Sequence, residues 1–296
     1  MLPTAATLTE KLPRPLRRHR LMTGWMRLTG EDPVQLVRIR DDAFGYADMS
    51  DGFLRLIVID GDYDRDFFRI ADALLGNGGE FLDVGANFGL LSFGLAPKHA
   101  ANVRFHLFEP IPRLLDAIGR TRALYPQMNA VVNGVAVSDY DGETAFDVAE
   151  EQTGASHIDP TGALRTPVVK LDTYLEEEGI EAVALMKLDV EGYELAALRG
   201  AVKALGRRAV AAIYFEYFEK CLVRVAPPEA LITFLDEAGY EVCFCREYDL
   251  AGVGGPTHTL AAGLPGHGLP LTPTRGRARP AMTDLFAAPR EHLVEL

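Results

Sequence analysis

The sequence predicts an α/β fold built on a doubly wound, mostly parallel sheet. From residue 80 onward, short apolar stretches alternate with segments of helical periodicity, which is the pattern of βαβ units. One of these stretches leads directly into a glycine-containing turn, as in sheets that bind nucleotide-like ligands. The chain has 296 residues, of which 48% are hydrophobic and 24% charged, so it is globular in composition and long enough to bury a sizeable core.

The strands and helices are expected where the hydrophobic period changes from two to about 3.6 residues. One helix, with apolar residues at positions 67, 70, 71 and 74, precedes the first strand, and another follows the glycine turn. Later helices are expected from the apolar positions within 114–118, 195–205 and 231–238. The candidate strands are 80–84, 103–108, 130–137, 185–190 and 210–215.

Two further parts are expected before the αβ pattern. Residues 1–33 form a basic arm, because residues 11–30 hold six Lys and Arg side chains and no acid. Residues 34–62 form a small antiparallel β extension, since β-prone runs at 34–39 and 53–59 flank turn-forming residues.

The αβ pattern itself occupies residues 63–250 and is interrupted once. The interval 141–173 is rich in glycine and proline, which predicts an inserted hairpin or lid rather than a crossover helix. Residues 251–296 hold seven glycines and six prolines, so they are expected to form a mobile or loosely packed tail.

Composition and charge restrict the function classes. Lys and Arg number 30 against 42 Asp and Glu, and a net charge of −12 disfavours a dedicated nucleic-acid binder. The chain has no apolar secretion signal and no apolar stretch of the roughly 20 residues that cross a bilayer. Three cysteines without a C-x-x-C pair fit buried free thiols in a reducing cytoplasm; these are Cys221, Cys243 and Cys245.

The glycine turn at residues 83–89 indicates the kind of ligand. Asn87 stands where a dinucleotide fingerprint would have its second glycine, so a pyrophosphate is disfavoured. Asp83 ends the strand, and two like charges about 4 Å apart would cost about 4 kcal/mol at an effective dielectric near 20. S-adenosylmethionine, with its ammonium and sulfonium groups, fits better. Gly85 and Gly89 would then let the backbone approach its methionyl part, and Asn87 could bond to its polar end.

The next two strand ends suggest the rest of a nucleoside site. Glu109 follows Asp83 by 26 residues and could accept hydrogen bonds from both ribose hydroxyls, in S-adenosylmethionine and NAD alike. The stretch from Asn133 to Ala136 would lie beside the adenine, with the Asn133 amide as its polar partner.

A second group of acids repeats the same layout. Asp189 and Glu216 each end a candidate strand, and Glu191 and Glu194 lie in the first turn of the helix after Asp189. Three or four carboxylates around one crevice are costly unless they share a cation or a proton. A functional role is therefore expected for Asp189, while Glu194 fits a structural one.

These motifs resemble the FkbM-type methyltransferases, a family of class I enzymes that depend on S-adenosylmethionine. The resemblance spans residues 53–217 and implies a Rossmann-like sheet of seven strands and methyl transfer, mostly to hydroxyl groups of natural products, sugars or glycolipids. Tyr63-Asp64 replaces the family's frequent Tyr-Glu pair, and the arm and tail have no counterpart. The motifs are D-V-G-A-N-F-G-x-x-S at 83–92, F-E-P at 108–110, A-V-S-D at 136–139 with Gly142, L-D at 171–172 and K-L-D-V-E-G-x-E at 187–194.

Several mechanisms stay open at this point. Asp189 is the first candidate to orient or deprotonate the acceptor, supported by Glu191 and Glu216, and His157 in the insertion is the second candidate base. In a competing version, Asp189 and Glu216 hold Mg²⁺, which polarises the acceptor. The alternative functions are an NAD-dependent oxidoreductase on the same sheet and a non-catalytic interaction module. The oligomeric state is open.

Overall fold

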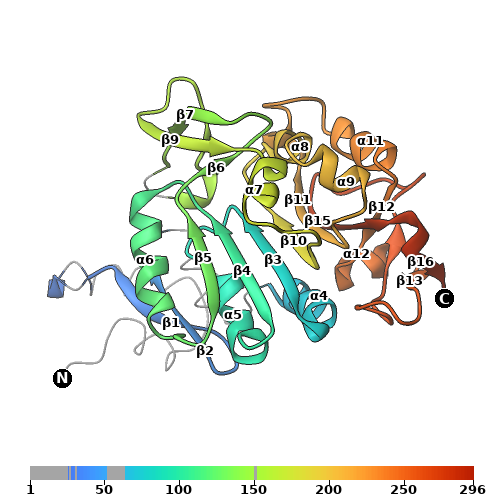
Figure 1. Ribbon diagram of the computed structural model, residues 1–296, viewed down its shortest axis with the longest axis horizontal. Coiled ribbons are helices and arrows are strands. Elements are labelled where there is room, and N and C mark those ends of the chain that lie inside the picture. Colours follow the sequence, from blue (N-terminus) through green and yellow to red (C-terminus); the bar gives the residue numbers. More distant parts are fainter. Residues whose placement is uncertain (1–25, 27, 31, 52–63, 150–151) are drawn as a thin grey trace.

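The computed structural model describes residues 26, 28–30, 32–51, 64–149 and 152–296 (Figure 1). Within them, eight strands form one sheet in the order β14-β12-β15-β11-β10-β3-β4-β5. The neighbours from β11 to β5 pair in parallel, whereas β15 runs antiparallel to β11 and β12. The strands are β3 (Gly79–Val84), β4 (Val103–Phe108), β5 (Asn129–Asn133), β10 (Leu185–Leu188), β11 (Ile213–Phe218), β12 (Tyr240–Phe244), β14 (Thr272–Pro273) and β15 (Met282–Pro289).

This α/β sheet confirms the expected fold class, with corrections to the strands. Within the described residues, seven strands of this sheet have four residues or more, and the two-residue β14 is an eighth at one edge. The expected strand 130–137 is divided: β5 ends at Asn133, and β6 (Ala136–Val137) joins a different sheet. The chain leaves the main sheet at Gly134 and Val135, between β5 and β6.

The expectation that residues 251–296 form a mobile or loosely packed tail is wrong. Strand β15 from this segment lies inside the sheet, and its Leu285, Phe286 and Ala287 are fully buried. All seven glycines of the segment precede residue 277, so an average over 46 residues conceals an apolar run near its end. The segment also contributes the pair β13 (His258–Leu260) and β16 (Leu293–Glu295).

Helices cover both faces of the sheet (Figure 1). One face packs against α4 (Arg65–Leu74), α5 (Leu90–His99) and α6 (Pro112–Arg122). The other packs against α7 (Leu171–Glu177), α8 (Glu194–Arg199), α9 (Val202–Gly206) and α11 (Glu229–Glu237). The shorter elements are α10 (Glu219–Leu222), α12 (Glu247–Gly252), η1 (Leu75–Asn77), η2 (Thr153–Ala155) and η3 (Arg290–His292).

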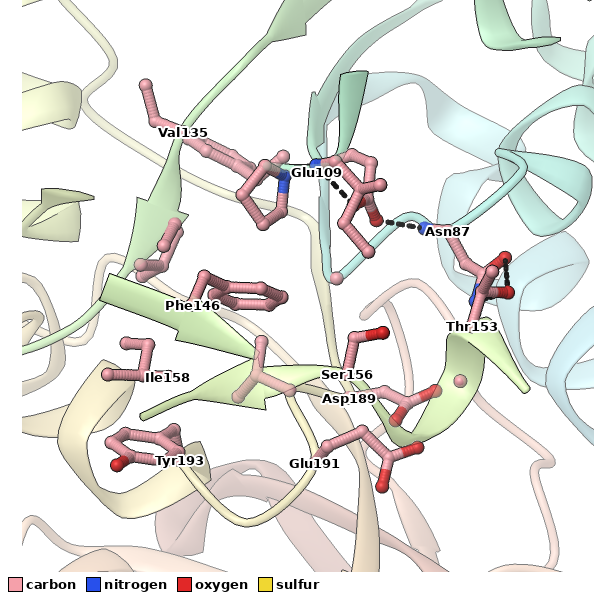
Figure 2. A pocket seen from close by; sticks show the side chains of 18 residues that line it. Asn87, Glu109, Val135, Phe146, Thr153, Ser156, Ile158, Asp189, Glu191 and Tyr193 are labelled. Atoms are coloured by element: carbon pink, nitrogen blue, oxygen red, sulfur yellow. Dashed lines mark hydrogen bonds between the residues drawn. The ribbon is translucent and has the colours of Figure 1, made fainter. Parts of the chain in front are cut away.

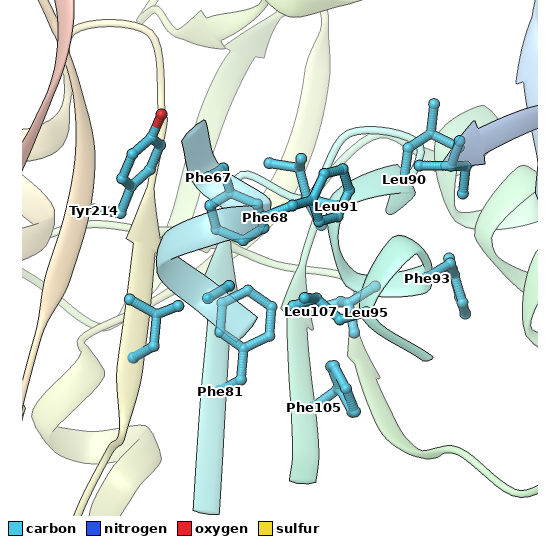
Figure 3. Packing of buried hydrophobic residues seen from close by; sticks show 14 of the residues in the cluster. Phe67, Phe68, Phe81, Leu90, Leu91, Phe93, Leu95, Phe105, Leu107 and Tyr214 are labelled. Atoms are coloured by element: carbon cyan, nitrogen blue, oxygen red, sulfur yellow. The ribbon is translucent and has the colours of Figure 1, made fainter. Parts of the chain in front are cut away.

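Alternation along the strands explains the two cores. In β3, Phe81 belongs to the core on the α4 and α5 side, and Leu82 belongs to the core on the opposite side. Phe81 meets Phe105 edge-on with ring centroids 5.8 Å apart, and Phe67 of α4 meets Tyr214 of β11 at 5.4 Å (Figure 3). This packing fixes the carboxyl ends of β3, β4, β10 and β11 relative to one another.

The N-terminal β extension packs on the α5 and α6 side. Strands β1 (Val34–Arg40) and β2 (Ala43–Asp48) pair antiparallel, and the Tyr46 amide donates to Thr121 Oγ1 of α6 at 2.8 Å. The second expected run of the extension, 53–59, lies outside the described residues, as does most of the arm 1–33.

The insertion 141–173 forms most of a second, smaller sheet. Its strands β7 (Gly142–Asp147), β8 (His157–Ile158) and β9 (Leu164–Val169) combine with β6 in the order β6-β9-β7-β8 within the described residues. Strands β7 and β9 are antiparallel, and α7 begins directly after β9.

The expectation for the cysteines is confirmed. All three cysteines are free and buried, as expected. Among the described residues, no helix has the length and apolar character needed to cross a membrane.

Candidate active site

The glycine loop between β3 and α5 is held by its neighbours. Gly85 has a φ of 81°, and a Cβ atom there would overlap the carbonyl oxygen of Asp189 at the end of β10. The amides of Gly85 and Ala86 donate to the Phe108 carbonyl at 3.1 and 2.9 Å. Glycine is therefore required at position 85, because the loop passes directly over the next strand end. Gly89, with a φ of 70°, occupies the N-cap of α5.

Glu109 directly follows β4 and lines the cavity beside the glycine loop. Its carboxylate is 4% exposed and accepts from the Asn87 amide and the Ile111 amide, both at 2.9 Å (Figure 2). Burial raises the pKa of Glu109 to about 8, although the two backbone hydrogen bonds oppose this shift. The group is thus largely protonated at neutral pH.

Asp83 differs from the expectation that it faces the ligand. Its side chain is fully buried, accepts from Ser92 Oγ at 2.6 Å and does not line the cavity beside the loop. Lys187 Nζ lies 3.5 Å from Asp83, 3.3 Å from Asp189, and donates to the Gly85 carbonyl at 2.6 Å. The Asp83 charge is therefore balanced by Lys187, whose position the strand-end pattern alone does not indicate.

The cavity beside the loop encloses about 610 Å³ of empty space, part of it open to solvent (Figure 2). Its walls come from the glycine loop, the ends of β4 and β10, the stretch after β5 and the insertion. Asn133 is not in the lining, and its amide nitrogen donates to the Leu107 carbonyl and the Tyr174 hydroxyl, both at 3.2 Å. The lining includes Gly85, Asn87, Glu109, Val135, Ala136, Phe146, Thr153, Ser156, Ile158, Asp189, Glu191 and Tyr193.

Three of the expected acids meet at one edge of this cavity. One carboxylate oxygen from each of Asp189, Glu191 and Glu216 lies within 4.8 Å of the others. Burial, followed by the charge of Asp189, raises the pKa of Glu191 to about 8 and that of Glu216 to about 9. Glu191 and Glu216 are therefore largely protonated at neutral pH. Glu191 also has a left-handed φ of 54°.

Glu194 has the structural role expected for it. Its Oε1 atom accepts from the amides of Val190 and Gly192 at 3.0 and 3.2 Å, which closes the turn before α8. The side chain is almost completely buried and does not line the cavity beside the glycine loop.

A comparison with known protein families matches residues 83–242 to the methyltransferase FkbM domain. The chain belongs to this family. The match covers more than half of the 296 residues and confirms the resemblance drawn from the motifs.

Solved structures similar to this FkbM chain include other methyltransferases. A precorrin-6y C5,15-methyltransferase from Geobacter metallireducens is 13% identical, with a TM-score of 0.39, over 75% of this chain and 87% of its own. An rRNA methylase from Streptococcus thermophilus is 10% identical, with a TM-score of 0.39, over 76% and 96%. M. jannaschii TYW2 in complex with AdoMet is 9% identical, with a TM-score of 0.39, over 88% and 86%. No match is found among curated proteins.

A second, broader hollow lies next to the cluster of Asp189, Glu191 and Glu216. It measures about 1800 Å³, including space open to solvent, and lies between α4, α12 and the ends of β11 and β15. Asp189 lines both this hollow and the first cavity, and Glu216 lines the hollow alone. Asp64 and Asp284 also face it, and burial raises the pKa of both. The sequence pattern did not indicate Asp284, because this residue lies in the segment 251–296 that was expected to be loosely packed.

His157 lies apart from the acids in this FkbM chain. It stands in β8 and lines neither cavity, and its Nδ1 lies 3.0 Å from the carbonyl oxygen of Ala155. The structure therefore brings Asp189, Glu191 and Glu216 together without the second candidate base.

Proposed function

We propose that the chain transfers the methyl group of S-adenosylmethionine to a hydroxyl oxygen of a small-molecule or glycan acceptor. The observation that carries this proposal is the position of Asp189, which lines both the cavity beside the glycine loop and the broader hollow. A donor in the first and an acceptor in the second would meet at this carboxylate.

The residues of the first cavity fit the proposed cofactor. Glu109 can accept from ribose hydroxyls, and the side chains of Val135, Phe146 and Ile158 offer an apolar surface to an adenine. When bound, S-adenosylmethionine supplies a methyl group on a positively charged sulfur, which Asp189 and Glu191 would favour electrostatically.

The chain's own residues would orient the acceptor and remove its proton. Alignment of two reactants can contribute roughly 7 to 11 kcal/mol, and a positioned base adds on the order of a hundred- to ten-thousandfold. The Asp189 side chain is 41% exposed, so an acceptor can reach it, and Lys187 at 3.3 Å holds it in place. Glu191 and Glu216 can take up the released proton once they have ionised.

Two observations bear on the alternatives. Membership of a methyltransferase family favours this proposal over an NAD-dependent oxidoreductase. The net charge of −12 and the acids facing the hollow disfavour a nucleic-acid acceptor. A Mg²⁺ ion held by Asp189 and Glu216 is an alternative way to activate the acceptor.

Binding and turnover test the proposal separately. Calorimetry should show binding of S-adenosylhomocysteine and none of NADH; the reverse result would favour the oxidoreductase. With pools of hydroxylated metabolites, Asp189→Asn should keep its affinity for S-adenosylhomocysteine within about twofold and lose about a hundredfold or more in turnover. Asp116→Asn, an exposed carboxylate of α6 outside both cavities, is the matched control.

Each remaining outcome has a definite meaning. Unaltered turnover in Asp189→Asn would refute its role as base. Turnover lost in EDTA and restored by Mg²⁺ would replace the base mechanism with the metal version, whereas full activity in EDTA would exclude that version. Binding without turnover in any pool would favour the non-catalytic module.

A further inference from the structure

Three segments that are distant in the sequence meet at the hydroxyl group of Thr153. Thr153 begins η2 in the insertion, and both its amide and its Oγ1 donate to Asp51 Oδ2, at 2.7 and 2.9 Å. Asp51 follows β2 of the N-terminal extension. The Asn87 side chain of the glycine loop lies on the other side of Thr153, with its Nδ2 3.4 Å and its Oδ1 3.5 Å from Oγ1 (Figure 2).

This contact is buried and joins the insertion to the loop. Asp51 is 3% exposed and Thr153 is 4% exposed, so the bonds between them are shielded from water. A carboxylate is costly to bury unless it accepts hydrogen bonds, and bonds to a charged acceptor are about twice as strong as neutral ones. Other insertion residues, including Phe146 and Ile158, form the cavity wall that faces Glu109.

The chain of hydrogen bonds continues from Thr153 to Glu109, the carboxylate proposed to bind the ribose. A threonine hydroxyl has one proton, so Oγ1 can donate to Asp51 while it accepts from the Asn87 amide. Asn87 Oδ1 accepts from the Phe88 amide at 2.9 Å, which fixes the orientation of the side chain. The backbone amide of the same Asn87 donates to Glu109 Oε2 at 2.9 Å. A shift of Thr153 therefore alters both the cavity wall and the setting of Glu109.

We propose that Asp51 and Thr153 are a positioning pair that holds the insertion against the glycine loop and thereby sets the affinity for the nucleoside cofactor. The inference rests on the proposed cofactor site. Asp51 does not line the cavity, and its bonds to Thr153 connect it to Asn87, which does.

Binding of S-adenosylhomocysteine to the full chain tests the pair by calorimetry. Thr153→Val keeps the shape of the side chain without its hydroxyl and should raise Kd about tenfold, and Asp51→Asn should raise it similarly. Thr153→Ser should restore binding to within about twofold. The double variant should be no weaker than the worse single variant, because both remove one interaction.

A matched control lies in the same insertion. Thr161 Oγ1 donates to Asp159 Oδ1 at 2.6 Å, but this pair is exposed and outside the cavity lining. Thr161→Val should leave Kd unchanged. In turnover, the Asp51 and Thr153 variants should raise KM for S-adenosylmethionine about tenfold and change kcat less than twofold. A general loss of folded enzyme would lower kcat instead.

The results separate three outcomes. If Asp51→Asn folds and binds as well as the parent, the pair does not set the affinity and the proposal is overturned. If that variant does not fold, amide exchange decides: Thr153→Val should speed exchange at residues 153–156 in the free protein, and unchanged exchange would overturn the proposal. If the parent protein does not bind S-adenosylhomocysteine, the cofactor assignment fails, and this inference fails with it.

Discussion

The affinity for S-adenosylhomocysteine should increase as the pH rises, because Glu109 must ionise before it can accept from two ribose hydroxyls. Burial raises its pKa to about 8 in the free protein. A group one pH unit below its pKa is ionised to about a tenth, and one unit above to about nine-tenths. Between pH 7 and pH 9 the Kd should therefore fall about tenfold, and from pH 6 to pH 7 it should fall by a similar factor.

Calorimetry in two buffers of different ionisation enthalpy measures this linkage directly. At pH 7 about one proton should leave the protein for each ligand bound, since Glu109 passes from mostly protonated to ionised. Glu109→Gln should bind weakly at every pH and release no proton from this site. Glu191→Gln is the matched control, because burial also raises the pKa of Glu191 to about 8 and its side chain lines the same cavity. A Kd that is constant from pH 6 to pH 9 would refute the reasoning, as would a pH dependence that persists in Glu109→Gln.

Two further outcomes follow from the fold. Gly85→Ala should lower the free energy of unfolding by about 2 kcal/mol or more in urea titrations, because φ is positive there and the new Cβ would overlap a carbonyl oxygen. Gly119→Ala, in α6 with open space around it, should instead stabilise by about 0.5 to 1 kcal/mol, and equal effects of the two would contradict this account. The free protein should also lose stability between pH 5 and pH 8. Glu109, Glu191 and Glu216 have raised pKa values when folded, so the folded state binds more protons than the unfolded state and stability falls by up to about 1.4 kcal/mol per pH unit for each group. Urea midpoints that rise over this range would show that these groups do not control the pH dependence.

The part of the site that could be predicted from the sequence is the part fixed by strand ends. Parallel strands bring their carboxyl ends to one edge, so Glu109 after β4 and Asp189 after β10 could be placed beside Gly85 without coordinates. Glu216 also lies next to Asp189, but β11 continues to Phe218, so Glu216 does not end its strand as expected. Local pattern is sufficient in these cases because the backbone itself determines the position.

Side-chain direction and distant contacts could not be predicted in this way. Asp83 precedes the strand end by one residue, and the pleat turns it toward Ser92 and Lys187 instead of the cavity. Asp51 and Thr153 are separated by 102 positions, and no periodicity links them. Nor could β15 be predicted from average composition, because its burial depends on β11 and β12 on either side.

A cationic donor would still be favoured electrostatically, by Glu191 and Glu216 instead of Asp83. Asp83 is compensated by Lys187, whereas burial first, and then the charge of Asp189, raises the pKa of Glu191 to about 8 and that of Glu216 to about 9. A positively charged sulfur beside these carboxyl groups would lower their pKa values, and the ionised carboxylates would stabilise the positive charge. Methyl transfer removes that charge, so the carboxylates would favour the donor over the neutral product. The same ionised acids would then be ready to accept the proton that the acceptor hydroxyl loses.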